Sequence, residues 1–155
     1  MSWTDEDIIE KIRDEKTVNY GFNLLMDKYQ EKVYWVIRRM VIEHGVADDL
    51  AQDTFVKVWK NIDSFKGGSK LYTWIYRIAT NEALNHLRKS KRRFFLPIGD
   101  IEYELTSSLD ADVYYNGDDI ELKLQKAILK LPKKQRLVFN MKYFEEMKFK
   151  DISEI

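Results

Sequence analysis

Apolar residues recur every three or four positions along most of this 155-residue chain. In one stretch the recurring positions are Phe22, Leu25, Met26, Tyr29, Val33, Val36 and Met40, and in another they are Leu71, Trp74, Ile75, Ile78, Ala79, Ala83 and Leu87. This spacing places an apolar stripe along one face of a helix. No segment alternates apolar and polar residues in a way that demands a sheet. The sequence therefore predicts an all-α fold.

Breaks in the periodicity divide the first 93 residues into four helices. A short helix follows Thr4, which we expect to cap it, and Gly45 is expected to end the second helix. Asp48 and Asp49 favour the start of the third, whose apolar positions are Leu50, Phe55, Val58, Trp59 and Ile62. The glycines in residues 64–70 predict a loop before the last helix. These helices are long enough to bury a common core.

The helical periodicity of apolar residues stops between residues 94 and 118. This segment contains Pro97, Gly99, two serines and Gly117, and it has no Lys or Arg. We interpret this segment as an extended acidic linker. Asp118 or Asp119 then caps a further amphipathic helix, and Pro132 interrupts it so that a new helix begins at Lys133. The predicted organisation is a helical module over residues 1–93, a linker over 94–118 and a smaller helical module over 119–155.

Charge is strongly segregated along the chain, although 26 basic residues balance 26 acidic ones. Residues 66–93 contain eight Lys and Arg against one Glu, a net charge of +7, whereas residues 94–121 contain eight Asp and Glu and no basic residue, a net charge of −8. The first block reads as a polyanion-binding face and the second as an acidic connector. The alternative is a basic helix that pairs with the acidic stretch inside the fold.

The composition argues against most enzyme chemistry. The chain has no Cys and two His, so it offers neither a thiolate nucleophile nor the ligands of a usual zinc centre. Asp48, Asp49 and Asp53 stand at a predicted helix start, where capping explains them better than metal binding. We therefore expect no catalytic residue, no metal and no cofactor. The charged N-terminus and the absence of an apolar run of about 20 residues predict a cytoplasmic protein without membrane insertion.

The last long helix of the first module combines aromatic and cationic side chains. Tyr72, Trp74 and Tyr76 are followed by Arg77 and then by Asn81, Asn85, His86, Arg88 and Lys89. Bases of unpaired nucleic acid stack on such rings while cations hold the phosphates. Trp74 fits the core stripe, whereas Tyr72 and Tyr76 fall off it. The basic end of the helix would hold duplex backbone without reading sequence, through Arg88, Lys89, Lys91, Arg92 and Arg93.

Several of these segments resemble a known family. Residues 22–30, 49–59, 65 and 71–83 are similar, in order and spacing, to regions 2.1 to 2.4 of an extracytoplasmic-function (ECF) sigma factor of the sigma-70 family. Residues 131–139 and 149–155 resemble the opening of region 4 and the first helix of its helix-turn-helix. The resemblance implies a helical region 2 domain, the acidic linker and a partial region 4 domain.

The resemblance also implies partners and site residues. Residues 49–59 would dock on the clamp helices of the RNA polymerase β′ subunit, and the polymerase-binding positions are Asp49, Gln52, Asp53, Val56 and Lys57. Phe65, the loop to Lys70 and Asn81 resemble the pocket that captures a base flipped from the minus-ten element. The full set of DNA-binding positions is Phe65, Lys66, Lys70, Tyr72, Tyr76, Arg77, Asn81, Arg88, Lys89, Lys91, Arg92 and Arg93.

The implied function is to direct core RNA polymerase to promoter DNA, and to melt and capture the minus-ten element during transcription initiation. Polymerase would supply the catalysis, and an anti-sigma factor is a common further partner in the family. The sequence stops before a second, recognition helix of region 4, so we expect this module to be incomplete and not to read a minus-thirty-five element. Two other functions remain open: a helical adaptor that binds only protein, and an enzyme acting on nucleic acid, for which Glu82 is the only acid in the basic block.

Overall fold

The computed structural model describes residues 2–93, 98–112 and 118–155, without the side chains of residues 91–104. Every regular element within these ranges is a helix. The first module contains α1 (Asp5–Arg13), α2 (Val18–Val41), α3 (His44–Asn61), the short 3-10 helix η1 (Ile62–Ser64) and α4 (Leu71–Arg93). They are followed by α5 (Ile98–Ala111), α6 (Asp119–Leu129), α7 (Lys133–Tyr143) and α8 (Phe149–Ser153). The all-α prediction is confirmed.

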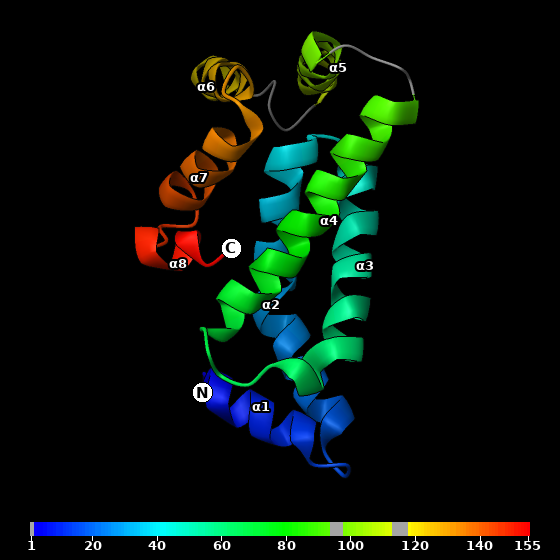
Figure 1. Cartoon of the computed structure of the whole chain (residues 1–155), viewed down its shortest axis with the longest axis vertical. Coiled ribbons are helices and arrows are strands. Elements are labelled where there is room, and N and C mark those ends of the chain that lie inside the picture. The colour runs from blue at the N-terminus through cyan, green and yellow to red at the C-terminus, as the bar shows by residue number, and fades with distance from the viewer. Residues whose placement is uncertain (1, 94–97, 113–117) are drawn as a thin grey trace.

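Three long helices, α2, α3 and α4, run alongside one another, and α1 crosses one end of α2 (Figure 1). Their inward faces supply most of the core, including the fully buried Val33, Ile37, Val58, Ile75 and Ala79. Val33, Val58, Ile75 and Ala79 belong to the apolar positions identified in the sequence, and Ile37 lies next to one of them, Val36. The stripes therefore do what their spacing predicts, which is to bury one face of each helix.

Three predicted helix starts agree with the structure. Thr4 caps α1 through a capping box: its hydroxyl accepts a hydrogen bond from the Asp7 amide at 3.1 Å, and the Asp7 carboxylate accepts one from the Thr4 amide at 3.1 Å. Asp118 caps α6 by accepting hydrogen bonds from two amides of its first turn. Pro132 stands directly before α7, as expected.

The predicted boundary between the second and third helices is wrong by several residues. The second helix ends at Val41 and α3 already begins at His44, so Gly45 lies in the first turn of α3 and does not end α2. The chain turns instead at Ile42, whose φ of 67° is in the left-handed region and whose amide donates to the Arg38 carbonyl. Burial of the Ile42 side chain holds this conformation.

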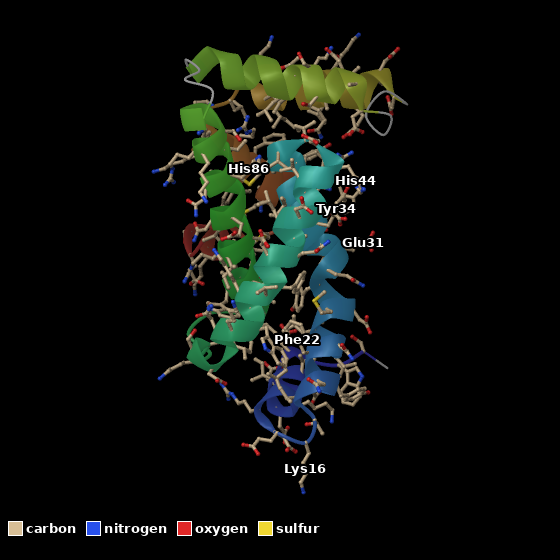
Figure 2. All side chains as sticks on the ribbon, turned by 90° about the vertical axis from the view of Figure 1, so that its right-hand side faces the viewer. Lys16, Phe22, Glu31, Tyr34, His44 and His86 are labelled. Carbon is tan, nitrogen blue, oxygen red and sulfur yellow. The ribbon has the colours of Figure 1, made fainter. Side chains whose placement is uncertain are left out.

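The sequence predicted an extended linker over residues 94–118. This prediction is wrong for residues 98–111, which form helix α5. Leu105 and Leu109 lie one turn apart and are buried. Helix α5 packs against α6, and the Asp110 carboxylate pairs with Lys126 of α6 at 2.7 Å. Tertiary packing thus overrides the weak helical signal of this segment. Figure 2 shows α5 lying across the ends of the long helices.

The acidic segment is also tied to the first module. The Asp112 carboxylate accepts a hydrogen bond from the buried Arg38 guanidinium at 2.5 Å. The ion pairs of Asp110 and Asp112 with Lys126 and Arg38 lie outside the basic block of residues 66–93. In these two ion pairs the acidic segment therefore binds cations of α2 and α6, and not the basic helix as the alternative interpretation proposed.

Candidate polymerase and nucleic-acid surfaces

Helix α3 has one outward face that carries all of the predicted polymerase contacts. Leu50, Phe55 and Val58 are buried on its other side. The exposed positions of the predicted set are Asp49, Gln52, Asp53, Val56 and Lys57. The amphipathic division of α3 expected from the sequence is therefore present, and these five side chains are available to a partner.

An apolar strip lies within this polar face. Val56 is 51% exposed and Trp59 is 43% exposed, although the sequence grouped Trp59 with the core stripe. The Trp59 ring packs edge-on against Phe22 of α2, with ring centroids 4.8 Å apart. The structure thus adds Trp59 to the candidate docking surface, a residue that helical spacing alone assigned to the interior. Exposed aromatic and aliphatic side chains of this kind often form the centre of a protein interface.

Phe65, proposed as a wall of the base pocket, is 5% exposed and lies 5.5 Å from the Trp74 ring. Its carbonyl accepts a hydrogen bond from Arg13 of α1 at 3.0 Å, which ties the loop before α4 to the first helix. Asn81 is exposed. It lies seven residues beyond Trp74 on the same side of α4, roughly 10 Å along the helix. Phe65 therefore lies beside Trp74 with its ring covered by packing, and Asn81 lies about two turns further along α4.

Lys70 and Tyr72 at the start of α4 share a partner on α8. One carboxylate oxygen of Asp151 accepts hydrogen bonds from Lys70 Nζ at 3.0 Å and from the Tyr72 hydroxyl at 2.7 Å. These bonds lower the pKa of Asp151, and the bond to Asp151 raises the pKa of Lys70. The carboxylate is thus held ionised between a cation and a hydroxyl.

Tyr76 is 4% exposed, so the expectation that it falls off the core stripe is wrong, whereas Tyr72 is half-buried. Burial, together with Glu145, raises the pKa of Tyr76. Arg77 donates to the Glu154 carbonyl through Nε at 2.8 Å and through a second guanidinium nitrogen. The physical reason for the error is a second packing layer: residues 144–155 cover a face of α4 that the sequence assigned to solvent.

The basic end of α4 is only partly described. Arg88 and Lys89 are exposed, as is Lys66 in the loop before the helix. The backbone of α4 continues to Arg93, but the side chains of Lys91, Arg92 and Arg93 lie outside the described residues. The described part of the predicted duplex-binding set therefore faces solvent.

A cavity of about 600 Å³ lies where residues 144–151 meet α1, α2 and α4. Its lining includes Lys28, Lys32, Lys70 and Lys148 among the cations, with Asp5, Glu145 and Asp151 among the carboxylates. Lys28 and the Tyr29 hydroxyl both donate to Asp5, at 2.7 and 2.8 Å. The cavity is polar and mixed in charge, unlike the apolar pockets typical of small-molecule sites.

The part of the chain that the structure describes contains no group of three or more His, Asp or Glu side chains arranged to hold a metal ion. His44 is exposed and bonds the Tyr34 hydroxyl at 2.5 Å, while His86 lies on α4, well away from it (Figure 2). No helix among the described residues is long and apolar enough to cross a membrane.

Comparison with known proteins gives consistent matches along the chain. The family described as "Sigma-70 region 2" matches residues 25–93, and "Sigma-70, region 4" matches residues 121–155. The chain is 37% identical over 143 residues to the "ECF RNA polymerase sigma factor SigW" of Bacillus subtilis, covering 87% of this chain and 76% of that protein. It is 33% identical over 164 residues to the "ECF RNA polymerase sigma-E factor" of Haemophilus influenzae, covering 98% of this chain and 83% of that protein.

The fold also resembles a solved structure. The sigma factor RpoE from Bartonella quintana, crystallised in complex with the anti-sigma factor NepR, matches with a TM-score of 0.63 and 23% identity, covering 85% of this chain and 80% of that one. At this identity the likeness concerns the fold.

Proposed function

The chain belongs to the ECF group of the sigma-70 family, and from that membership we propose that it binds core RNA polymerase and directs it to promoters. The observation that carries the proposal is the coincidence of the region 2 match over residues 25–93 with an α3 face that leaves every predicted polymerase contact exposed. The relatives are named as RNA polymerase sigma factors.

Docking on polymerase would use the exposed face of α3. Val56 and Trp59 supply apolar area, and the surrounding carboxylates and Lys57 supply the polar rim that protein interfaces usually have. Helix α3 also packs directly on α4, and Lys57 pairs with Glu82 of α4 at the edge of this contact. Binding of polymerase to α3 would therefore position α4 relative to the DNA.

Capture of the minus-ten strand would use α4 and the loop before it. Lys66, Lys70 and Arg77 provide cations, and Asn81 provides an amide that can read the edge of a flipped base. Arg88 and Lys89 face solvent about two turns beyond Asn81, where they can hold the phosphates of the adjoining duplex. Each stacked base supplies ~1–3 kcal/mol, which offsets the few kcal/mol of unstacking. No nucleotide hydrolysis is needed for this step.

The polymerase-binding proposal is tested by Val56→Asp. A charge placed in the apolar part of an interface should weaken binding to core polymerase by about tenfold or more. The matched control is Ile120→Asp, because Ile120 is 80% exposed in the first turn of α6, where a carboxylate is favourable. Affinity is measured by co-purification and by titration with fluorescently labelled chain. Equal affinity of the two variants would contradict docking through α3.

The strand-capture proposal is tested in the assembled holoenzyme, with selection of bound promoter sequences followed by opening assays on the selected promoter. Asn81→Ala should reduce opening and relax base preference at one position of the minus-ten element. Asn85→Ala is the control, since it removes the same amide from an exposed site one turn further along α4. If both variants behave alike, Asn81 is not the base-reading residue. A holoenzyme that binds polymerase but selects no promoter would favour a protein-binding adaptor instead.

An inhibitory protein partner remains a prediction from the family resemblance.

A further inference from the structure

Glu82 is the one acidic residue in the basic block of residues 66–93, and it directly follows Asn81, the residue proposed to read a flipped base. We infer that Lys57 of α3 has a role in promoter binding besides polymerase docking: it neutralises Glu82, so that α4 presents no uncompensated negative charge to the captured strand. Lys57 is then a positioning residue that acts on DNA through Glu82. The inference rests on the proposed function, because it concerns strand capture by α4.

The first observation is the ion pair between the two helices. The Lys57 ammonium group donates to the Glu82 carboxylate where α3 and α4 lie side by side (Figure 1). Val58 and Ala83, the residues that follow them in the sequence, are buried, so the pair lies at the edge of the packed contact. The Glu82 side chain is 13% exposed, whereas that of Lys57 is 52% exposed. The carboxylate is thus largely shielded from water and depends on its partner more than a surface acid does.

The second observation is that α4 itself offers no Lys or Arg to Glu82. On a helix, side chains three and four residues apart are neighbours. Around Glu82 these positions are 78, 79, 85 and 86, and they hold Ile, Ala, Asn and His. Arg77 is five residues away and donates to the Glu154 carbonyl. The compensating cation therefore comes from α3, and Lys57 pairs across the helix contact although Asp53 lies one turn earlier on its own helix.

The third observation is the place of this carboxylate relative to the proposed DNA path. Asn81 is exposed, and Glu82 is the next residue of the same helical turn. A strand whose base is read by Asn81 brings its phosphates to this part of α4. Charges closer than the Debye length, about 10 Å at 0.1 M salt, still act on one another. An unpaired Glu82 would therefore repel the strand, and the pairing with Lys57 removes that repulsion.

The two roles of Lys57 are compatible. A lysine ammonium group has three N–H donors, and about half of the Lys57 side chain stays exposed beside Glu82. The same group can therefore contact polymerase while it neutralises the carboxylate of α4. Loss of Lys57 should then weaken two separate steps. Removal of the Glu82 charge should restore DNA binding but not polymerase binding.

The test uses Lys57→Met, which keeps most of the aliphatic length and removes the charge, Glu82→Gln, and the double variant. Each full chain is assembled with core polymerase in saturating excess, so that differences in polymerase affinity do not limit the complex. The probe is a fluorescently labelled forked DNA with a single-stranded minus-ten element, taken from a promoter selected with the unsubstituted holoenzyme. We expect Lys57→Met to weaken DNA binding by about threefold at low salt and by less at high salt, since salt screens the repulsion. The double variant should bind DNA as tightly as the unsubstituted holoenzyme.

The matched control is the ion pair of Lys126 and Asp110, which joins α6 to α5 outside the basic block. Lys126→Met, alone and combined with Asp110→Asn, makes the same charge changes there, and we expect neither variant to alter DNA affinity. If the control pair reproduces the loss and the recovery, net charge explains the effect and the inference is overturned. It is also overturned if Lys57→Met leaves DNA affinity unchanged, or if adding Glu82→Gln does not restore it.

Two further measurements separate this inference from the proposed function. Titration of core polymerase with labelled chain gives the docking affinity, which Glu82→Gln should not change in the Lys57→Met background. Asn81→Ala should weaken binding of the forked DNA if α4 captures the strand, whatever Lys57 does. If Asn81→Ala has that effect and the double variant still binds DNA weakly, the function stands and the neutralising role of Lys57 is wrong. If Asn81→Ala has no effect, the assigned DNA face is wrong and the role of Lys57 is refuted with it.

Discussion

Gly21 lies where α1 crosses α2, and replacing it by Ala should destabilise the fold. A Cβ at this position would lie 2.7 Å from the Ile12 nitrogen, 2.9 Å from Ile12 Cγ1 and 2.9 Å from the Lys11 carbonyl carbon. Favourable contacts between carbon atoms are about 3.5–4.0 Å. Two of the three atoms belong to the backbone of α1 and cannot rotate away. The whole of α1 must therefore shift to accept the methyl group.

Two opposing effects set the magnitude. Ala is favoured over Gly inside a helix by about 1 kcal/mol. Overpacking a core costs about 1–3 kcal/mol, and a clash with backbone belongs at the upper end of that range. We expect the Gly21→Ala chain to lose about 2 kcal/mol of unfolding free energy. For a chain of this size that corresponds to a Tm lower by roughly 4–8 °C.

The matched control is Gly45→Ala in the first turn of α3. The nearest atom to a Cβ there is the Glu43 carboxylate oxygen at 4.0 Å, so the methyl group meets no obstacle. This variant should gain a few tenths to about 1 kcal/mol from helix propensity alone. Thermal and urea unfolding of both variants measure the difference. A Gly21→Ala chain that is stabilised like the Gly45→Ala chain would show that α1 does not approach α2 as closely as described.

The Gly21→Ala substitution has a second readout near the proposed DNA face. Arg13 at the end of α1 donates to the Phe65 carbonyl, so a displaced α1 should loosen the loop before α4. Trypsin should then cleave after Lys66, which is exposed, faster than in the unsubstituted chain. An unchanged cleavage rate would indicate that the loop is held by the packing of Phe65 alone.

Three further outcomes follow from the contacts described above. Thr4→Ala should cost about 1 kcal/mol, because it removes the capping hydroxyl of α1, and an unchanged urea midpoint would contradict this. Asp112→Ala should cost on the order of 3 kcal/mol, because it removes the carboxylate partner of the buried Arg38, and Asp112→Asn should recover part of the loss. Burial raises the pKa of Tyr29 and Tyr76 above the ordinary value of 10.0, so the folded chain retains protons that the unfolded chain has lost. Stability should therefore be unaffected by these groups below pH 10 and fall above it, by up to about 1.4 kcal/mol per pH unit for each tyrosine, and Tyr→Phe at either position should reduce that slope in urea titrations.

Much of the fold could be predicted because its signals are local. The capping box at Thr4, the Asp118 cap of α6 and the break at Pro132 depend on a few neighbouring residues. The exposed polar face of α3 also follows from helical spacing, except that Trp59 is exposed and not in the core. By contrast, the helix at residues 98–111 was missed because its stability comes from packing on α6 and not from its own residues.

The proposed strand-capture face of α4 could be predicted only in part, because some of its contacts come from a distant segment of the chain. The sequence determined which residues stand on α4 and that Trp74 and Ile75 turn toward the other long helices. It did not indicate that Tyr76 and Arg77 would meet a segment about 70 residues further along the chain. A helical period assigns one buried face, whereas a second buried face depends on which distant segment packs there. The sequence alone thus determined the helices, their caps and the family, and only the tertiary structure decided that residues 144–155 lie over the proposed DNA face.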